Sequence, residues 1–402
     1  MPDLRVLDEG GRLIHFKASV EQNTDSTERI KMICCGDTGP VRKLEKIVIE
    51  NGPDHILKEI RPILNRGDIV FANLEAPFSE RGKPLDRIPV FRLNPKSFEI
   101  VSTANINVVS LANNHMFDYG PDAFIDTLNI LKTHKIYHFG AGLSINEALE
   151  PSILTIKGLK FGFIGFREKE DSFYDDNGVI TPQIDKNLII DQIESLRNQV
   201  DWLVLSLHFG WEYVFYPAPI DVDMCHSFID AGADLIIGHH PHYPQGLEIY
   251  RNKLIIYSLG NFIWDQNFAG HTNSSYLVEI DISGKSIQNV NVIPFEMDRK
   301  YVLKIRKDED NLKFINDISV AFKQPKNLNK KWYLITRNKM IQNLLILRSI
   351  FKSKRNVLKK LSAWFKNLFS PRMKYTLKSF IWFMVTGRAL YFEIQRKSQE
   401  RT

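Results

Sequence analysis

Residues 232–246, GADLIIGHHPHYPQG, join a short apolar run to a turn rich in histidine and proline. The run 233–237 predicts a buried strand, and Pro241 and Pro244 stiffen the turn that follows it. Imidazoles on a stiff turn at the carboxyl end of a strand suit metal ligation, because rigid backbone fixes their approach. A polar loop with incidental histidines is the simpler alternative, but the density of the cluster favours metal ligands. The three histidines are His239, His240 and His242.

Apolar runs alternate with helical patterns from Ile30 onward. This alternation predicts an α/β fold with function at the carboxyl ends of the strands. Two further runs, 276–284 and 286–297, predict an antiparallel pair joined by a Ser-Gly-Lys turn. The predicted strands are 30–35, 68–73, 107–112, 161–166, 202–208, 234–238 and 254–260. The predicted helices are 54–65, 95–104, 121–134, 185–199 and 221–231.

Charge divides the 402 residues unevenly. From Lys323 to the C-terminus lie 20 of the 53 Lys and Arg residues but 2 of the 47 Asp and Glu residues, so this part carries a net charge of +18 and the rest −12. We therefore predict three parts: a polar N-terminal segment 1–29, an α/β domain 30–300 and a basic helical tail 323–402. Three of the six tryptophans lie in the tail. The tail is helical by propensity, with apolar residues at helical spacing.

A basic amphipathic tail suits an anionic membrane surface or a partner bound to that membrane. Packing of its apolar faces on the main domain is an equally good alternative. Nucleic acid is the weaker option, because the acidic body would repel it. We find neither an N-terminal apolar run of signal-peptide length nor a run of about 18 apolar residues, which predicts a cytoplasmic protein, peripheral at most to the inner face of the membrane. Cys34, Cys35 and Cys225 are expected to be buried, reduced thiols.

Polar side chains follow five of the predicted strands. Each group has a plain explanation, such as a turn aspartate or a capping asparagine, but five groups at strand ends of one α/β chain indicate a shared site. Mixed carboxylate, amide and imidazole ligands suit Mn, Fe or Zn. One or two such ions would favour cleavage of a phosphoester, with His115 placed to protonate the leaving oxygen. The five segments are GDTGP (36–40), NLE (73–75), LANNHMFDYG (111–120), LHFGWEY (207–213) and GHHPH (238–242).

Five motifs resemble, in order, those of the CapA family of capsule and poly-γ-glutamate biosynthesis proteins, which is related to the calcineurin-like metallophosphoesterases. They are NLEAP, LANNHMFDYG, LHFGWEY, GADLIIGHHPH and YSLGNFIWDQ. The resemblance covers about residues 31–297 and implies a four-layer αββα sandwich with a metal centre between the edges of two sheets. It implies that His115 is the catalytic histidine. The metal ligands that it implies are Asp37, Glu75, Asn114, His208, His240 and His242.

The sequence departs from true phosphoesterases in two places. Gly39 stands where their first motif has a ligand histidine, and Asn73-Leu74-Glu75 replaces their Gly-Asp-x-x-Asp. Both changes bear on whether one or two ions bind, and His239 or Glu212 is a possible replacement for the missing ligand.

Other polar residues near the motifs are candidates for binding substrate. Arg92 and Arg167 follow strand-like runs and could pair with an anionic substrate, with surface ion pairing as the simpler alternative. Asn73 and Asn261 are further candidates at the rim of the site. The sequence thus predicts a CapA-like, metal-dependent phosphoesterase acting on a phosphorylated or polyanionic intermediate in surface-polymer biosynthesis. The alternative is a non-catalytic assembly or export factor that keeps the fold with at most one metal.

Overall fold

The computed structural model describes residues 29–323 apart from Ile88, 170–179, 267–269 and 307–308, and also Leu328, Trp332, Leu334 and Ile335. Contacts divide the chain into two units. The larger comprises 1–168, 175–217 and 224–320, and contains both β-sheets and the whole candidate site. The predicted segment 1–29 and tail 323–402 lie outside the described residues, except for Arg29, Lys323 and the four single residues named above.

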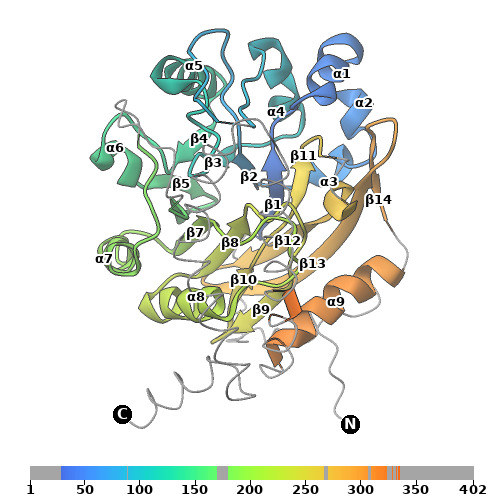
Figure 1. Ribbon diagram of the computed structural model, residues 1–402. Helices are drawn as coiled ribbons and strands as arrows, with labels where there is room; N and C mark the ends of the chain where they lie inside the picture. The colour runs from blue at the N-terminus through green and yellow to red at the C-terminus, as the bar shows by residue number, and fades with distance from the viewer. Residues whose placement is uncertain are drawn as a thin grey trace, which may run out of the picture. The chain divides into compact units, whose positions relative to one another are not determined.

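The first sheet has eight strands, and its central strands are parallel (Figure 1). Its order is β14 (Leu303–Ile305), β13 (Ser286–Met297), β12 (Ser274–Ser283), β1 (Ile30–Thr38), β2 (Ile69–Leu74), β3 (Val108–Ser110) and β4 (Tyr137–Phe139). Strand β11 (Asn261–Ile263) pairs with the end of β1.

The second sheet has six strands and a parallel centre formed by β6, β7, β8 and β10. Its order is β5 (Ser152–Ile156), β6 (Leu159–Arg167), β7 (Trp202–His208), β8 (Leu235–His239), β10 (Lys253–Ile256) and β9 (Leu247–Tyr250).

Helices cover the outer faces of the sheets. Helices α1 to α5 pack against the first sheet, and Leu196 of α7 lies against Gly162 of β6 in the second. Within the described ranges, the α-helices are α1 (Lys43–Asn51), α2 (Asp54–Leu57), α3 (Arg61–Leu64), α4 (Glu99–Thr103), α5 (Gly120–Thr133), α6 (Ile145–Leu149), α7 (Lys186–Arg197), α8 (Pro219–Ala231) and α9 (Glu309–Lys323). The 3₁₀ helices are η1 (Pro95–Phe98) and η2 (Gly270–Asn273). None of the described helices combines the length and apolarity needed to cross a membrane.

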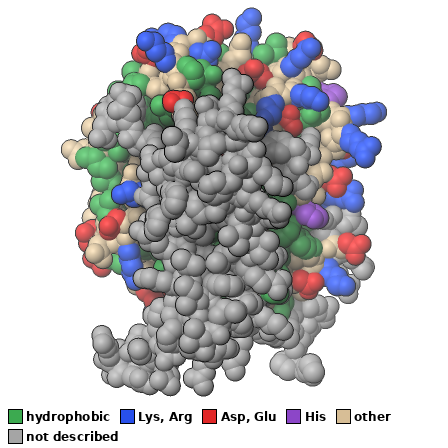
Figure 2. Space-filling view, in the orientation of Figure 1, with side chains coloured by type: hydrophobic (Ala, Val, Ile, Leu, Met, Phe, Trp, Pro, Cys, Tyr) green, Lys and Arg blue, Asp and Glu red, His purple; other side chains and the backbone are tan. Residues whose placement is uncertain are grey.

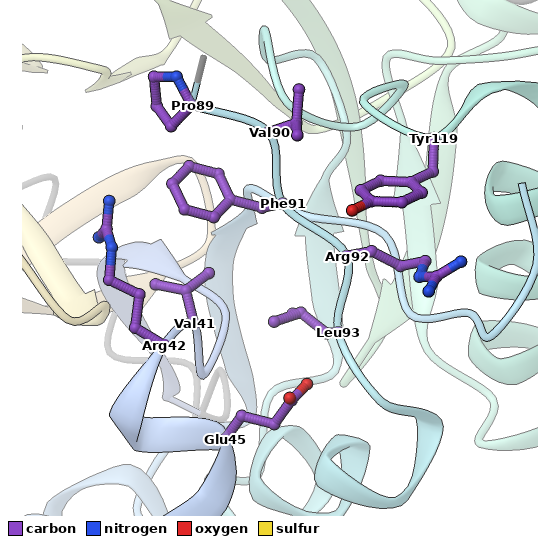
Figure 3. A pocket seen from close by; sticks show the side chains of 9 residues that line it. All are labelled: Val41, Arg42, Glu45, Pro89, Val90, Phe91, Arg92, Leu93 and Tyr119. Carbon is purple, nitrogen blue, oxygen red and sulfur yellow. The ribbon is translucent and has the colours of Figure 1, made fainter. Parts of the chain in front are cut away.

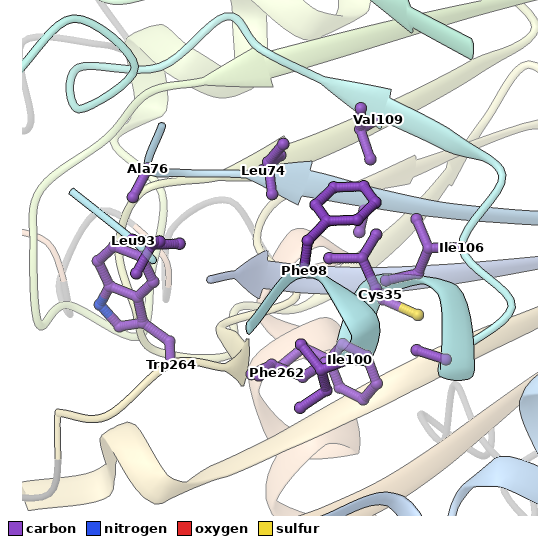
Figure 4. Packing of buried hydrophobic residues seen from close by; sticks show 14 of the residues in the cluster. Cys35, Leu74, Ala76, Leu93, Phe98, Ile100, Ile106, Val109, Phe262 and Trp264 are labelled. Atoms are coloured by element: carbon purple, nitrogen blue, oxygen red, sulfur yellow. The ribbon is translucent and has the colours of Figure 1, made fainter. Parts of the chain in front are cut away.

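Strand alternation separates two hydrophobic cores. In β1, Ile33 and Cys35 face the core under the helices, whereas Met32 and Cys34 face the core between the sheets. Successive side chains of a strand point to opposite faces, so a strand buried on both sides reads as one continuous apolar run. Figure 4 shows the helix-side core, where Phe98 and Ile100 lie against β1 and β2. The resulting α/β sandwich confirms the predicted fold class.

Most predicted strands are confirmed, including the antiparallel pair β12–β13. The single helix predicted over 54–65 is wrong, because the structure has two short helices there. Pro62 explains the break: it has no N–H to donate, so it sits in the first turn of a new helix. The sequence prediction also omits short elements such as β4 and α6. Cys34, Cys35 and Cys225 are buried, as predicted, and no disulfide joins them.

Candidate metal centre

The candidate site lies where the carboxyl ends of parallel strands from both sheets meet. Asp37 in β1 is in register with Asn73 in β2, and with Asn261 in β11 on its other side. In the second sheet, His208 ends β7 in register with His239 at the end of β8. Parallel strands present their carboxyl ends at one edge, so groups far apart in sequence come together.

Among the residues that the structure describes, two sets of three side chains are close enough to hold a metal ion. In each set, one potential ligand atom per residue lies within 4.8 Å of the others. Glu75 belongs to both sets and is positioned to bridge two cations. The first set is Asp37, Glu75 and His242, and the second is Glu75, His208 and His240. All five residues were predicted as ligands from the sequence.

Asp37 lies among hydrogen-bond donors and imidazoles at the buried end of β1. Its Oδ1 accepts a hydrogen bond of 2.8 Å from Asn73 Nδ2. Its Oδ2 lies 3.0 Å from His242 Nδ1, and His239 Nδ1 lies 3.4 Å from its Oδ1. Burial would raise the pKa of Asp37, but the hydrogen bonds and charges of His239 and His242 hold that pKa well below its usual value.

The pKa of Glu75 shifts in the opposite direction from that of Asp37 in the same site. Burial, and then the nearby negative charge of Asp37, raise the pKa of Glu75 well above its usual value. Its Oε2 accepts from Asn73 Nδ2 at 3.2 Å, while its Oε1 lies 3.7 Å from His208 Nε2 and 3.9 Å from His242 Nε2. Among the described residues, no hydrogen-bond donor satisfies Glu75 Oε1. A buried oxygen without a donor would be satisfied by a cation.

His208 gives a second indication that the residues fit a metal. Its Nε2 lies 3.0 Å from Asn114 Oδ1, 3.1 Å from His240 Nδ1 and 3.7 Å from Glu75 Oε1. One ring nitrogen cannot serve all three neighbours, whereas a cation among them could take a lone pair from each. Burial, and then the charge of His240, lower the pKa of His208 well below its usual value, which favours the neutral, ligating form.

Asparagine side chains hold these ligands in place. Asn73 bonds both carboxylates, and Asn113 Nδ2 in turn donates to Asn73 Oδ1 at 3.1 Å. Asn261 Oδ1 lies 2.9 Å from His242 Nδ1, and its amide donates to Gln266 and to the backbone of Thr272. The structure therefore places Asn73 and Asn261, which we had predicted to bind substrate, in contact with the candidate ligands Asp37, Glu75 and His242.

His115 lies in the loop after β3 and is fixed from one side. Its Nδ1 is 2.7 Å from Asp118 Oδ2, and Arg87 donates to Asp118 Oδ1. Arg87 also donates to the backbone oxygen of Asn114. Because Asp118 engages Nδ1, Nε2 is the ring nitrogen left for proton transfer.

Three features of the site were not predicted. Arg87 is one, and no sequence motif marks it. The role of Asp118 could have been inferred, because it follows His115 by three residues in one loop. The third is Gly39: a Cβ there would lie 3.1 Å from the Trp264 ring and 3.2 Å from Leu93 Cδ1, so Trp264 fills the space of the missing ligand.

The remaining predicted residues fall into three places. His239 contacts Asp37 but belongs to neither ligand set. Surface ion pairing is wrong for Arg167, which is 1% exposed, ends β6 in register with His208, and donates to Thr181 and to the backbone of Glu168. Arg92 lies outside the ligand cluster, where it donates to the backbone oxygens of Glu80 and Arg81 and lines a separate pocket.

An α/β sandwich with mixed carboxylate, amide and imidazole groups at strand ends of both sheets defines a metallophosphoesterase-like protein. The family model described as bacterial capsule synthesis protein PGA_cap matches residues 31–266, and the chain belongs to this family. It is 29% identical to the PGA biosynthesis protein CapA of Bacillus subtilis (strain 168) over 280 residues, which cover 68% of this chain and 73% of that protein. It is 28% identical to the capsule biosynthesis protein CapA of Bacillus anthracis over 285 residues, covering 67% and 68%.

A solved structure of a hypothetical protein from Thermus thermophilus has a TM-score of 0.43 and 16% sequence identity. The match covers 67% of this chain and 99% of that one.

Proposed function

We propose that this member of the capsule synthesis family is a metal-dependent phosphoester hydrolase in the biosynthesis of a capsule-type surface polymer. The observation that carries the proposal is the pair of ligand sets that share Glu75. A bridging carboxylate flanked by imidazoles is the donor set for two neighbouring Mn, Fe or Zn ions. The substrate class that we propose is a phosphorylated or polyanionic intermediate of the polymer.

The protein residues have separate tasks in this reaction. Asp37, Glu75, Asn114 and the three histidines of the two sets would hold the ions, which supply a water of lowered pKa and neutralise charge on the phosphoryl oxygens. Asn73 and Asn261 keep the ligands oriented. The three histidines are His208, His240 and His242.

His115 is the proton donor to the leaving oxygen in this proposal. Asp118 fixes the ring through Nδ1, and Arg87 fixes the carboxylate of Asp118. The imidazole ring is thereby held in one orientation, which fixes the direction of the proton on Nε2. A proton donor positioned in this way increases the rate of proton transfer roughly 100-fold or more.

The test is metal analysis of the purified full-length protein together with hydrolysis of a simple aryl phosphodiester. We expect about one or two transition-metal ions per chain, and loss of activity in His242→Ala. His55→Ala is the control, because His55 lies on α2 and contacts Lys300 instead of the site. Absence of bound metal, or unchanged hydrolysis in His242→Ala, would contradict the proposal.

One observation favours a second candidate, a non-catalytic assembly or export factor with at most one ion. Trp264 fills the space beside Gly39, so the ligand found there in true phosphoesterases is lost. This candidate predicts a stoichiometry of one ion or less and no hydrolysis of any phosphodiester in the same experiment.

We further propose that the basic tail, 323–402, docks on an anionic membrane surface or a membrane-bound polymer synthase at the inner face of the membrane. The charge of +18 in the tail supports this, whereas Figure 2 shows acidic and basic side chains interspersed over the described surface on one face. We expect the full-length protein to sediment with anionic vesicles in low salt and to remain in solution with neutral vesicles. Equal sedimentation with both would contradict electrostatic docking.

A further inference from the structure

A pocket of about 460 Å³ opens between the start of α1 and the segment 89–93 (Figure 3). It contributes no ligand to either metal set. Its lining combines three charged side chains with two aromatic rings. These are Arg42, Glu45, Arg92, Phe91 and Tyr119.

Phe91 connects this pocket to the candidate metal centre. Its ring centroid lies 4.8 Å from that of His115 and 5.1 Å from that of Trp264, with both rings edge-on. Its backbone N–H donates to Asp118 Oδ2 at 2.7 Å. A single aromatic ring therefore separates the pocket from the histidine that we assign as proton donor.

The charges of the pocket favour an anion. Figure 3 shows Arg42 and Arg92 on opposite sides of the pocket, with Val41 and Leu93 between them and the Arg92 guanidinium pointing away from Arg42. Arg42 Cζ is 4.9 Å from the Phe91 ring centroid, and Arg92 Cζ is 4.5 Å from the Tyr119 ring centroid. The Nη1 atoms of the two arginines donate to backbone oxygens, of Asp265 for Arg42 and of Glu80 and Arg81 for Arg92. A carboxylate would therefore pair with the positive charge of each guanidinium.

Glu45 opposes the two arginines only in part. Its Oε1 accepts a hydrogen bond from the backbone N–H of Asn94. In Figure 3 the Glu45 carboxylate points into the pocket from the bottom of the view. Two guanidinium groups against one carboxylate leave the lining net positive. An acidic group entering between the arginines would therefore be attracted by the field of the pocket.

The backbone gives an independent indication at Arg42. This residue precedes α1 with φ 57° and ψ −120°, a conformation that side chains bearing a Cβ rarely adopt. Its guanidinium donates to the backbone oxygen of Asp265, in the segment that follows β11. Backbone strain of this kind concentrates at ligand-binding sites, where the surrounding structure maintains it.

We propose that the pocket binds the leaving group of the substrate and selects one that carries a carboxylate. This inference rests on the proposed hydrolysis, in which water oxygen bonds to phosphorus and the bond from phosphorus to the leaving oxygen breaks. The leaving oxygen takes the proton of His115, and the proton that water loses returns to His115 through solvent. The Phe91 ring contacts His115 and also lines this pocket, so a leaving group released beside His115 is separated from the pocket by that ring alone.

The test uses two methyl aryl phosphodiesters whose leaving phenol carries a para-propanoate or a para-propanamide. The two-carbon spacer keeps the leaving abilities similar, so the ratio of their kcat/KM values reports the pocket. We expect the full-length protein to favour the carboxylate about tenfold. Arg42→Gln and Arg92→Gln should each move the ratio toward one, whereas Arg251→Gln, an exposed arginine paired with Asp230, should leave it unchanged.

Equilibrium binding separates failure of the pocket from failure of the proposed function. Calorimetry compares para-hydroxyphenylpropanoate with its amide, which requires no turnover. Tighter binding of the carboxylate that is lost in Arg42→Gln supports the pocket even if neither diester is hydrolysed. Equal affinities, or an equal kcat/KM for both diesters, would overturn it. If both diesters are hydrolysed with equal kcat/KM, the proposed role of the pocket is contradicted but the proposed hydrolytic function is not.

Discussion

The two sheets contribute different side chains to the candidate metal centre: carboxylates and amides come from the first sheet, and imidazoles come from the second. Each ligand set takes residues from both sheets, so neither sheet holds a complete set alone. Imidazoles from one sheet face carboxylates from the other. The first sheet and its loops supply Asp37, Asn73, Glu75 and Asn114, and the second supplies His208, His239, His240 and His242. The site therefore depends on how the sheets pack, and its ions would in turn join them.

The largest expected effect comes from removing the carboxylate that both ligand sets share. Glu75→Gln keeps the shape of the side chain but removes the bridging charge, so both ions should be weakened. We expect hydrolysis of an aryl phosphodiester to fall by more than about 100-fold, since even groups that only orient metal ligands contribute 10- to 100-fold. Metal content measured on the same samples should fall as well. Glu50→Gln, at an exposed site on α1, is the matched control, and an active Glu75→Gln protein would contradict the bridging role.

The next effect tests His115, a first-sheet residue outside the ligand sets. Asp118→Asn removes the carboxylate beside Nδ1 and leaves the ring poorly oriented. We expect kcat to fall about 100-fold for a diester with an alkyl leaving group, which needs a proton. The loss should be much smaller for para-nitrophenolate, which leaves without one. Equal losses on both substrates would indicate a structural role, and Asp122→Asn on the exposed face of α5 is the control.

A smaller effect is expected where a first-sheet amide supports a second-sheet histidine. Asn261→Ala removes the contact of Asn261 Oδ1 with His242 Nδ1 and changes no contact of His208 or His240. We expect metal affinity to fall about tenfold in one of two binding steps. Metal titration followed by calorimetry measures this, with Asn129→Ala on α5 as the control. Equal weakening of both steps would show that the two sets are not independent.

The smallest expected effect is on the thermal stability of metal-free protein, in which Glu75 and Asp37 should respond to pH in opposite ways. The folded pKa of Glu75 is raised, so the folded state binds the proton more tightly than the unfolded state, and stability falls as pH rises through the window above the usual pKa of Glu75. Glu75→Gln should therefore raise the Tm of chelator-treated protein by about 3 °C near pH 7, and by less near pH 4.

Asp37 should behave in the opposite way. Its folded pKa is lowered, so its carboxylate stabilises the fold above the usual pKa, and that contribution is lost as pH falls through the folded pKa. Asp37→Asn should accordingly lower the Tm near pH 7. Thermal denaturation at several pH values tests both variants, and shifts of the same sign would contradict the contrast.

Sequence reasoning was strongest where the physical signal is local. A strand buried on both faces must be apolar throughout, so β1, β2, β7 and β8 were predictable. It was weaker for three-residue strands such as β4, whose pattern is too short, and for the helix over 54–65, which Pro62 divides.

The order of residues along the chain predicts which polar groups stand at the strand ends, because each group follows its own apolar run whatever the packing of the sheets. Which of these groups meet depends on the folded arrangement of the two sheets. The tertiary structure showed that Glu75 is common to both sets, that Trp264 fills the space beside Gly39, and that Arg87 reaches Asp118 from a distant loop. These contacts depend on how two sheets and their loops pack across the chain, and no local pattern encodes a distance of that kind.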